Sequence, residues 1–351
     1  MSLQVKINKK IIGENQPVYI IAEAGSNHNT NFGTALELID TAVAAHADAV
    51  KFQLFKAEKL YPKNAGIAKY LAKDYKNIHD LIRSMEMPVE WLPKLVAYCK
   101  KKNIEFLCSP FDEESADALD TVGVAAFKIA SSECNHTKLI EHVAKKGKPI
   151  ILSTGISSLG EIEEAVNIIR KYHDKIIIMH CIVSYPAEIK DTNLRYVQYL
   201  KDVFRCPSGL SDHSLDPLVL PIAMTAIGGK IIEKHFTLDK KSAGPDHKFA
   251  IEPGELTAMV TTIRLTEATL APRQNKILES EQELVEVSKR AIQTTKNIKK
   301  GETLNTSNIA ILRPGKNLKG IAPRFYDGIV GKKVNKNIEE GSGVRWDDLL
   351  N

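Results

Sequence analysis

The sequence predicts an α/β protein, a (β/α)8 (TIM) barrel followed by a small β-rich domain. From about residue 18 to residue 270, short apolar runs alternate with amphipathic stretches. The runs are continuously apolar, as expected for parallel strands buried on both faces. Eight strand–helix units in about 250 residues match the usual size of this barrel. An open doubly wound sheet is the alternative, but no G-x-G-x-x-G motif follows the first predicted strand.

The barrel elements follow one another in chain order. Strands are expected at residues 18–22, 48–53, 104–108, 125–129, 149–153, 175–181, 206–210 and 229–235. Between them, apolar residues recur with the period of a helix that buries one face. This pattern predicts helices at residues 33–45, 89–102, 113–121, 159–171 and 215–227, among others.

Two segments depart from this alternation. Residues 54–88 form a connection long enough to be a functional loop or lid. After the barrel domain, residues 1–270, a linker is expected at 271–284. A second domain then spans 285–351, with short β-like pieces at 290–294, 309–312, 328–333 and 343–346. A domain of that size is marginal alone, so we expect it to depend on a partner.

Composition excludes several classes of protein. The chain is 43% apolar and 26% charged, as in ordinary globular proteins, and its net charge of +5 is too mild for a nucleic-acid partner. No apolar run is long enough to span a membrane, and no signal-peptide pattern opens the chain. The five scattered cysteines form no C-x-x-C pair. These features predict a cytoplasmic protein.

Polar or ionisable residues lie at or near the carboxyl end of every predicted barrel strand, where the active sites of such barrels lie. They include Glu23, Lys51, Gln53, Ser109, Lys128, Ser131, Glu133, Ser153, His180, Tyr185, Ser211, His213 and His235. His213 and His235 close two neighbouring strands. Two neutral imidazoles that face one point can hold a divalent metal with positions open for water and substrate. The alternative is that each histidine is hydrogen-bonded within the structure.

Lys51 and Lys128 interrupt apolar strands, and a buried lysine needs an anion to stay charged. With the nearby serine hydroxyls, the two lysines could bind a phosphate and a carboxylate. Alternatively, each lysine pairs with an internal carboxylate such as Glu23 or Glu133. Glu23, Gln53, Tyr185 and Asp246 could bind sugar hydroxyls, although Asp246 in Gly-Pro-Asp could equally form a turn.

Taken together, these segments resemble the sialic acid (N-acetylneuraminate) synthase family, which includes spore-coat polysaccharide, legionaminic and pseudaminic acid synthases. The matching motifs are AEAGSNH at 22–28, VKFQ at 50–53, FKIAS at 127–131, ILSTG at 151–155, SDH at 211–213, EKHF at 233–236 and GPDH at 244–247. In the tail, Arg313-Pro314-Gly315 is similar to a motif of the family's antifreeze-like (SAF) domain. The resemblance covers nearly all of the chain.

The resemblance implies an enzyme that condenses phosphoenolpyruvate with an N-acyl hexosamine, either N-acetylmannosamine or a diacetamido dideoxy analogue. It implies that His213 and His235 hold Mn²⁺ or Mg²⁺. It also implies a domain-swapped homodimer in which Arg313 reaches the N-acyl group from the other subunit. The implied phosphoenolpyruvate site is Lys51, Ser109, Lys128, Ser131, Ser153 and Ser211; the implied amino-sugar side is Glu23, Gln53, Tyr185 and Asp246, with Glu133 near the reacting centre. Glu23 and Glu133 are the candidates for proton transfer.

Two departures leave the acceptor sugar open. Val183-Ser184 stands where the best-known members place Asn before Tyr-Pro, and the 54–88 loop does not align. A phosphorylated hexosamine is therefore a third possible acceptor, although no extra basic cluster lies near Tyr185. Two other classes remain. One is another phosphoenolpyruvate-dependent 2-keto-3-deoxy sugar acid synthase that acts on a phosphorylated sugar, and the other is a non-catalytic sugar-binding protein.

Overall fold

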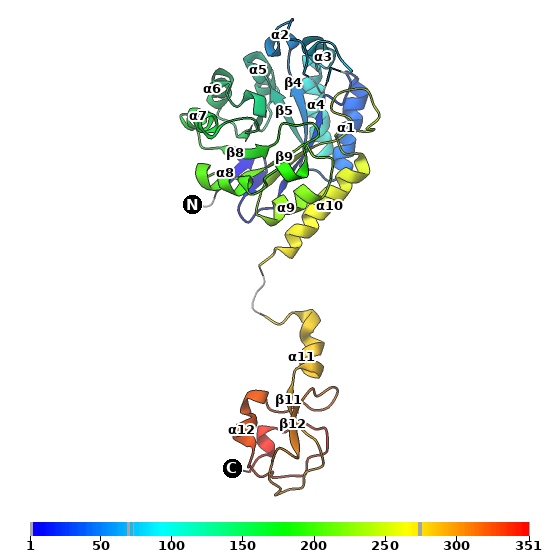
Figure 1. Cartoon of the computed structure of the whole chain (residues 1–351), viewed down its shortest axis with the longest axis vertical. Helices are drawn as coiled ribbons and strands as arrows, with labels where there is room; N and C mark the ends of the chain where they lie inside the picture. Colours follow the sequence, from blue (N-terminus) through cyan, green and yellow to red (C-terminus); the bar gives the residue numbers. More distant parts are fainter. Residues whose placement is uncertain (1–2, 69–70, 73, 273–275, 351) are drawn as a thin grey trace. The chain divides into compact units, whose positions relative to one another are not determined.

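The computed structural model describes residues 3–68, 71–72, 74–272 and 276–350. The chain divides into two compact units, Met1–Ala271 and Pro272–Asn351 (Figure 1). Each unit has its own hydrophobic core. In the described residues, no helix is long and apolar enough to cross a membrane.

The first unit is a barrel of parallel strands. The strands are β3 (Tyr19–Gly25), β4 (Ala49–Leu54), β5 (Glu105–Pro110), β6 (Phe127–Ile129), β7 (Ile150–Ser153), β8 (Ile176–Cys181), β9 (Ser208–Asp212) and β10 (Ile231–His235). They pair in the order β5-β4-β3-β10-β9-β8-β7-β6. The end strands β5 and β6 also lie against each other, so the sheet nearly closes. The predicted (β/α)8 barrel is confirmed.

Helices surround the strands (Figure 1). They are α1 (Phe32–Ala44), α4 (Leu92–Lys102), α5 (Glu113–Thr121), α6 (Thr137–Lys145), α7 (Leu159–Arg170), α8 (Tyr196–Phe204), α9 (Val219–Ala226) and α10 (Pro253–Thr269), with single turns η1 (Val89–Trp91), η2 (Ser131–Glu133) and η3 (Ile189–Asp191). Helix α9 begins four residues later than predicted. At this end, the Asp216 carboxylate accepts hydrogen bonds from the backbone N–H groups of Leu218, the N-cap residue, and Val219, the first residue of the helix.

A hairpin that the sequence reasoning missed precedes the barrel. Strands β1 (Gln4–Ile7) and β2 (Lys10–Gly13) pair antiparallel. Val5, Ile7 and Ile12 pack in one cluster with the residues that begin the barrel strands, such as Tyr19 and Ile231. The hairpin therefore fills the end of the barrel opposite the carboxyl ends of the strands.

The alternation of side chains along each strand places the site residues. In β10, Ile231 belongs to the inner cluster and Ile232 to the outer one. Because successive side chains of a strand point to opposite faces, Glu233 and His235 face inward and Lys234 faces the helices. The same alternation turns Lys51 inward in β4, where Ala49 is inner and Val50 outer.

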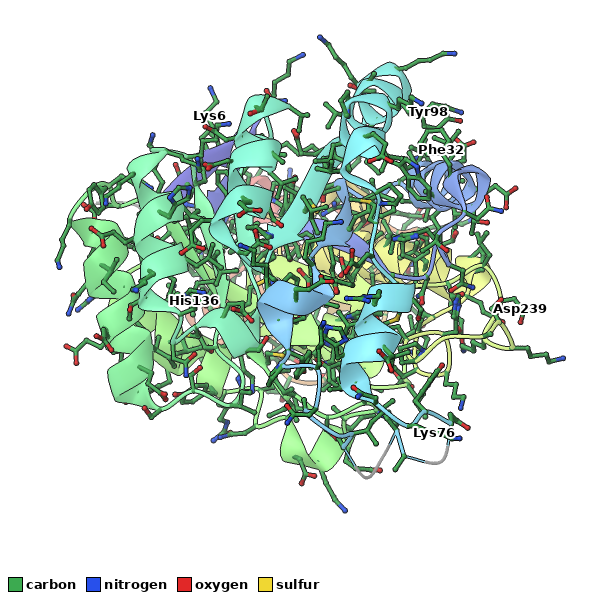
Figure 2. The ribbon with its side chains drawn as sticks, turned by 90° about the horizontal axis from the view of Figure 1, so that it is seen from above. Lys6, Phe32, Lys76, Tyr98, His136 and Asp239 are labelled. Carbon is green, nitrogen blue, oxygen red and sulfur yellow. The ribbon has the colours of Figure 1, made fainter. Side chains whose placement is uncertain are left out.

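The long connection after β4 contains two short helices, α2 (Ala57–Leu60) and α3 (Ile78–Ser84). It is tied to the β10–α10 loop by an ion pair between Lys248 and Asp74, at 2.7 Å. Figure 2 labels one exposed residue of each loop, Lys76 and Asp239, at the edge of the view.

The second unit contains η4 (Glu279–Glu281), α11 (Gln282–Ser288), β11 (Ala291–Thr294), β12 (Ile309–Leu312), η5 (Pro323–Phe325), α12 (Tyr326–Ile329) and η6 (Trp346–Asp348). Helix α11 thus crosses the expected boundary at residue 284. Strands β11 and β12 pair antiparallel.

The β-like pieces predicted at 328–333 and 343–346 do not form strands. Residues 328–329 end α12, and Gly343 forms only an isolated bridge with Gln293. A Cβ on Gly343 would lie 2.1 Å from the backbone nitrogen of Gly320. The β-like sequence at this position therefore marks a close approach of two backbone segments and does not mark a strand in a sheet.

Candidate active site

A cavity of about 850 Å³ lies at the carboxyl ends of the barrel strands. Its lining includes Lys51, Gln53, Ser109, Lys128, Ser131, Glu133, Ser153, Tyr185, Ser211, His213, His235 and Asp246. The structure thus brings together the site residues that the sequence singled out in the barrel, apart from His180 and Glu23. Glu23 is fully buried and does not line the cavity, but it contacts the lining residue Lys51.

Lys51 is held by an internal carboxylate. Its Nζ lies 2.9 Å from Glu23 Oε2 and donates a hydrogen bond to Ser109 Oγ at 3.2 Å. Gln53 Nε2 donates to the other oxygen of Glu23 at 2.8 Å. Burial opposes the charge of Lys51, but the carboxylates of Glu23 and Glu233 outweigh it and raise the pKa of the lysine. Burial also raises the pKa of Glu23, against the effect of Lys51.

A second carboxylate, Glu233, lies between the two lysines. Its Oε1 is 3.6 Å from both Lys51 Nζ and Lys128 Nζ, and Ser211 Oγ donates to it at 3.4 Å. Burial would raise the pKa of Glu233, but the two lysines lower it overall. The sequence reasoning did not count Glu233 as a site residue. Its place two residues before His235 was the available signal, because both then face the same side of β10.

Lys128 is the less satisfied of the two lysines. In the described part of the chain, it forms no hydrogen bond, and its one ion pair is with Glu233. Burial is the dominant influence and lowers the pKa of Lys128, although Glu233 opposes it. The pairing of each lysine with a carboxylate is thus realised, but the partner of Lys128 is Glu233 and not Glu133. The ammonium of Lys128 retains the capacity to bind another anion.

His213 and His235 meet at the cavity wall, with ring centroids 5.4 Å apart. His213 Nδ1 lies 2.9 Å from the carbonyl of Ile182, so Nδ1–H donates, and in the neutral ring Nε2 carries the lone pair. His235 Nδ1 is buried without a hydrogen bond, 3.7 Å from Asp246 Oδ2. Burial and the nearby His213 hold the pKa of His235 well below its usual range. A neutral, unsatisfied imidazole is the form that binds a metal.

Among the described residues, no group of three or more His, Cys, Asp or Glu side chains has the arrangement of a metal site. The candidate ligands for a divalent cation at this wall are the two histidines. This donor set fits a catalytic site that leaves positions for water and substrate, and it does not fit a closed structural site.

An aromatic group packs against the histidines. The ring centroid of Tyr185 lies 4.5 Å from that of His213, and the centroid of Phe249 lies 5.0 Å from that of His235. Phe249, which the sequence reasoning did not single out, also contacts Tyr185. Phe249 lies three residues after Asp246 and therefore belongs to the same loop, but the sequence did not indicate that this loop packs against the histidines.

Asp246 approaches the cavity beside Gly25. A Cβ on Gly25 would lie 3.4 Å from Asp246 Oδ2 and from Glu23 Oε1, and its φ of 52° is in the left-handed region that favours glycine. Burial raises the pKa of Asp246 to about 6.

The remaining predicted residues divide by location. Ser131 Oγ accepts a hydrogen bond from Gly155 N at 3.0 Å, and Ser153 Oγ is buried without a partner. Glu133 is buried in η2, which raises its pKa. His180 instead has a structural contact, with Nε2 2.5 Å from the carbonyl of Thr192. Arg313 directly follows β12 in the second unit and is exposed.

The fold and the site define a (β/α)8 barrel with a polar cavity at its carboxyl end, joined to a small second unit. The NeuB family model matches residues 38–275, and the SAF domain model matches residues 289–350. The chain belongs to the NeuB family, and the predicted resemblance is confirmed.

Similar proteins agree with this assignment. The spore coat polysaccharide biosynthesis protein SpsE of Bacillus subtilis is 42% identical, over 98% of this chain and 97% of that protein. The N,N'-diacetyllegionaminic acid synthase of Campylobacter jejuni is 39% identical, over 93% of this chain and 98% of that enzyme. The crystal structure of N-acetylneuraminic acid synthetase from Leptospira borgpetersenii, in complex with citrate, superposes with a TM-score of 0.73. It is 37% identical and covers 82% of this chain and 96% of its own.

Proposed function

We propose that this protein condenses phosphoenolpyruvate with the open-chain form of an N-acyl hexosamine, giving a nonulosonic (sialic-type) acid and phosphate. The observation that carries the proposal is the pair of buried lysines, Lys51 and Lys128, on either side of Glu233 and beside the two histidines. The names of the relatives support it, because several are synthases of legionaminic or pseudaminic acid.

The proposed reaction balances without an oxidant or reductant. C3 of phosphoenolpyruvate attacks the aldehyde carbon of the sugar and forms the new C–C bond, and the aldehyde oxygen takes a proton. Water adds to the cationic C2 and loses a proton, which gives a tetrahedral centre that carries the phosphate. Phosphate leaves with cleavage of the C–O bond and takes up the proton of the C2 hydroxyl, and C2 becomes a ketone.

The chain's own groups have distinct roles in this proposal. Lys51 and Lys128 bind the phosphate and carboxylate, together with Ser109, Ser131, Ser153 and Ser211, and their charge offsets the anion in a water-poor site. Glu133 and Glu23 are suited to proton transfer because burial raises the pKa of each. His213 and His235 would hold Mn²⁺ or Mg²⁺, which would polarise the aldehyde as a Lewis acid.

The acceptor side is formed by Gln53, Tyr185 and Asp246. Lys248 is the only further lysine or arginine among the described residues that line the cavity, and it is paired with Asp74 at 2.7 Å. This pairing favours an acceptor without a phosphate. We propose further that Arg313 binds the N-acyl group from the partner subunit of a domain-swapped homodimer, and that the enzyme acts in the cytoplasm.

The test is phosphate release from phosphoenolpyruvate with Mn²⁺, measured in parallel with N-acetylmannosamine, diacetamido sugars and phosphorylated hexosamines. EDTA-treated protein is the control. Release that requires both metal and one unphosphorylated acceptor is the expected result. Release only with a phosphorylated sugar would favour the alternative synthase, and no release with any acceptor would contradict the proposal.

A further inference from the structure

Lys234 is the most completely coordinated buried charge near the site, although it faces away from the cavity. Its side chain is 1% exposed. Its ammonium donates to Asp212 Oδ2 at 2.7 Å, to the carbonyl of Ser214 at 2.6 Å, to Ser214 Oγ at 3.1 Å and to the carbonyl of Asp216 at 2.9 Å. All of these acceptors come from one five-residue segment, 212–216, which wraps around a single cation.

This arrangement sits immediately beside the histidine pair. Lys234 and Asp212 are register partners in the parallel ladder of β9 and β10. In both segments the next residue is a histidine, His235 after Lys234 and His213 after Asp212. Because side chains alternate, the ion pair lies on the helix side of the sheet and the histidines lie on the cavity side. The last rung of the ladder before the two histidines is thus an ion pair of which both members are buried.

The segment has little freedom to move. Asp212 and Ser214, the neighbours of His213, both bind Lys234, and Asp212 Oδ1 also accepts from the backbone N–H of Ser214 at 2.8 Å. The carbonyl of His213 accepts from the N–H of Ala187 at 3.0 Å, and its Nδ1 is held by Ile182. The backbone of His213 is thus fixed from the helix side by Lys234 and from the cavity side by the segment after β8.

We infer that Lys234 is a positioning residue that fixes His213 relative to His235 and thereby sets the affinity of the two-histidine site for a divalent cation. The inference rests on the metal assignment made under Proposed function. Contacts that orient a metal ligand without touching the metal contribute to the affinity of the site. The competing explanation is that Lys234 only stabilises the start of α9, through Asp216.

Direct Mn²⁺ binding to the full-length protein separates the two explanations, with free Mn²⁺ measured by electron paramagnetic resonance. Lys234→Met removes the cation but leaves the Asp212 carboxylate buried without its ion-pair partner. The double variant Asp212→Asn/Lys234→Met removes both charges and keeps the experiment valid if the single variant does not fold. Asp48→Asn is the matched control, because Asp48 is an ion-pair partner of Arg264 at the opposite end of the same barrel, where it binds the N–H of Ile20 at 2.7 Å.

The expected result is a Kd for Mn²⁺ that rises about 10- to 100-fold in the Lys234 variants, the range found when a residue supporting a ligand is lost. Asp48→Asn should lower the Tm without changing that Kd. A Lys234 variant with a lower Tm and an unchanged Kd would overturn the inference and leave the metal assignment intact. Wild-type protein that binds no Mn²⁺, or binding that survives His213→Ala, would overturn the metal assignment and the inference with it.

Discussion

Glu233 Oε1 lies 3.6 Å from Lys128 Nζ, and this is the one ion pair that Lys128 forms in the described part of the chain. The distance is too long for a hydrogen bond, so the lysine is neutralised but not saturated. An arriving phosphate or carboxylate would complete its coordination. The geometry thus separates a lysine that is already engaged, Lys51, from one that is available.

Lys128→Met should lower kcat/KM for phosphoenolpyruvate at least about 100-fold, because the proposed contact between the buried lysine and the bound anion is lost, and loss of one partner of such a charge pair costs on the order of 2–5 kcal/mol. The variant should fold, since Glu233 keeps Lys51 within 3.6 Å. Steady-state kinetics of phosphate release measure the effect. Lys230→Met is the control, because Lys230 binds the carbonyl of Gln16 away from the cavity. A loss below about threefold in Lys128→Met would remove this lysine from the substrate site.

His213→Ala and His235→Ala should each abolish metal-dependent turnover, by at least about 1000-fold, while far-ultraviolet circular dichroism stays unchanged. The reason is that either substitution leaves a single imidazole for the cation. His180→Gln is a matched control, because His180 is a buried histidine of the same rim that binds the carbonyl of Thr192. Equal turnover in all three variants would defeat the metal assignment.

Arg313→Ala should raise the KM of the acceptor at least about tenfold and change that of phosphoenolpyruvate much less, because the arginine is proposed to bind only the N-acyl group. Arg324→Ala, a second cation of the same unit that packs over the Phe325 ring, should change neither. The two KM values are measured by varying one substrate at saturation of the other. Equal increases in both would contradict the role given to Arg313.

Stability should fall with acid because of His28. This side chain is fully buried, its Nδ1 accepts a hydrogen bond from the N–H of Thr30, and burial lowers its pKa to about 4. The unfolded chain binds the proton near pH 6.5, so the contribution is complete above that pH and is lost as pH falls toward 4. The loss at pH 4 is on the order of 3 kcal/mol.

Urea unfolding between pH 7.5 and 4.5 measures this effect in wild type and in His28→Gln. The variant should show a shallower decline of the unfolding free energy with acid. His46→Asn, at an exposed position with φ of 59°, should retain the wild-type slope. Parallel slopes in all three proteins would show that His28 is not the group that titrates.

The sequence was most informative for strands that are buried on both faces of the sheet. The eight barrel strands are apolar on both faces, so their runs stood out, and their carboxyl ends placed the lysines and histidines together. The hairpin β1–β2 was missed because its strands have only four residues, although Gln4–Ile7 alternates exposed and buried side chains as an edge strand does. The pieces at 328–333 and 343–346 failed because an isolated bridge and a ladder share the same local pattern.

The partners of the buried charges could not be predicted in the same way. Which carboxylate meets Lys128 depends on the register of strands on opposite sides of the barrel, and a single sequence does not contain that register. Glu23 and Glu133 were the internal carboxylates considered for the two lysines, whereas Glu233 reaches Lys128 from across the barrel. Residues 212–216 wrap around the ammonium of Lys234 in a conformation that local propensity does not specify.

The hairpin packed by Val5, Ile7 and Ile12 has a kinetic consequence. Because that end of the barrel is filled, both substrates of the proposed reaction enter the cavity from the carboxyl ends of the strands. The two lysines are buried there, whereas Tyr185 is 36% exposed. A sugar bound beside Tyr185 would therefore block access of phosphoenolpyruvate to the lysines. Turnover should therefore follow a compulsory sequence, with phosphoenolpyruvate loaded first and phosphate retained until the sugar product has departed.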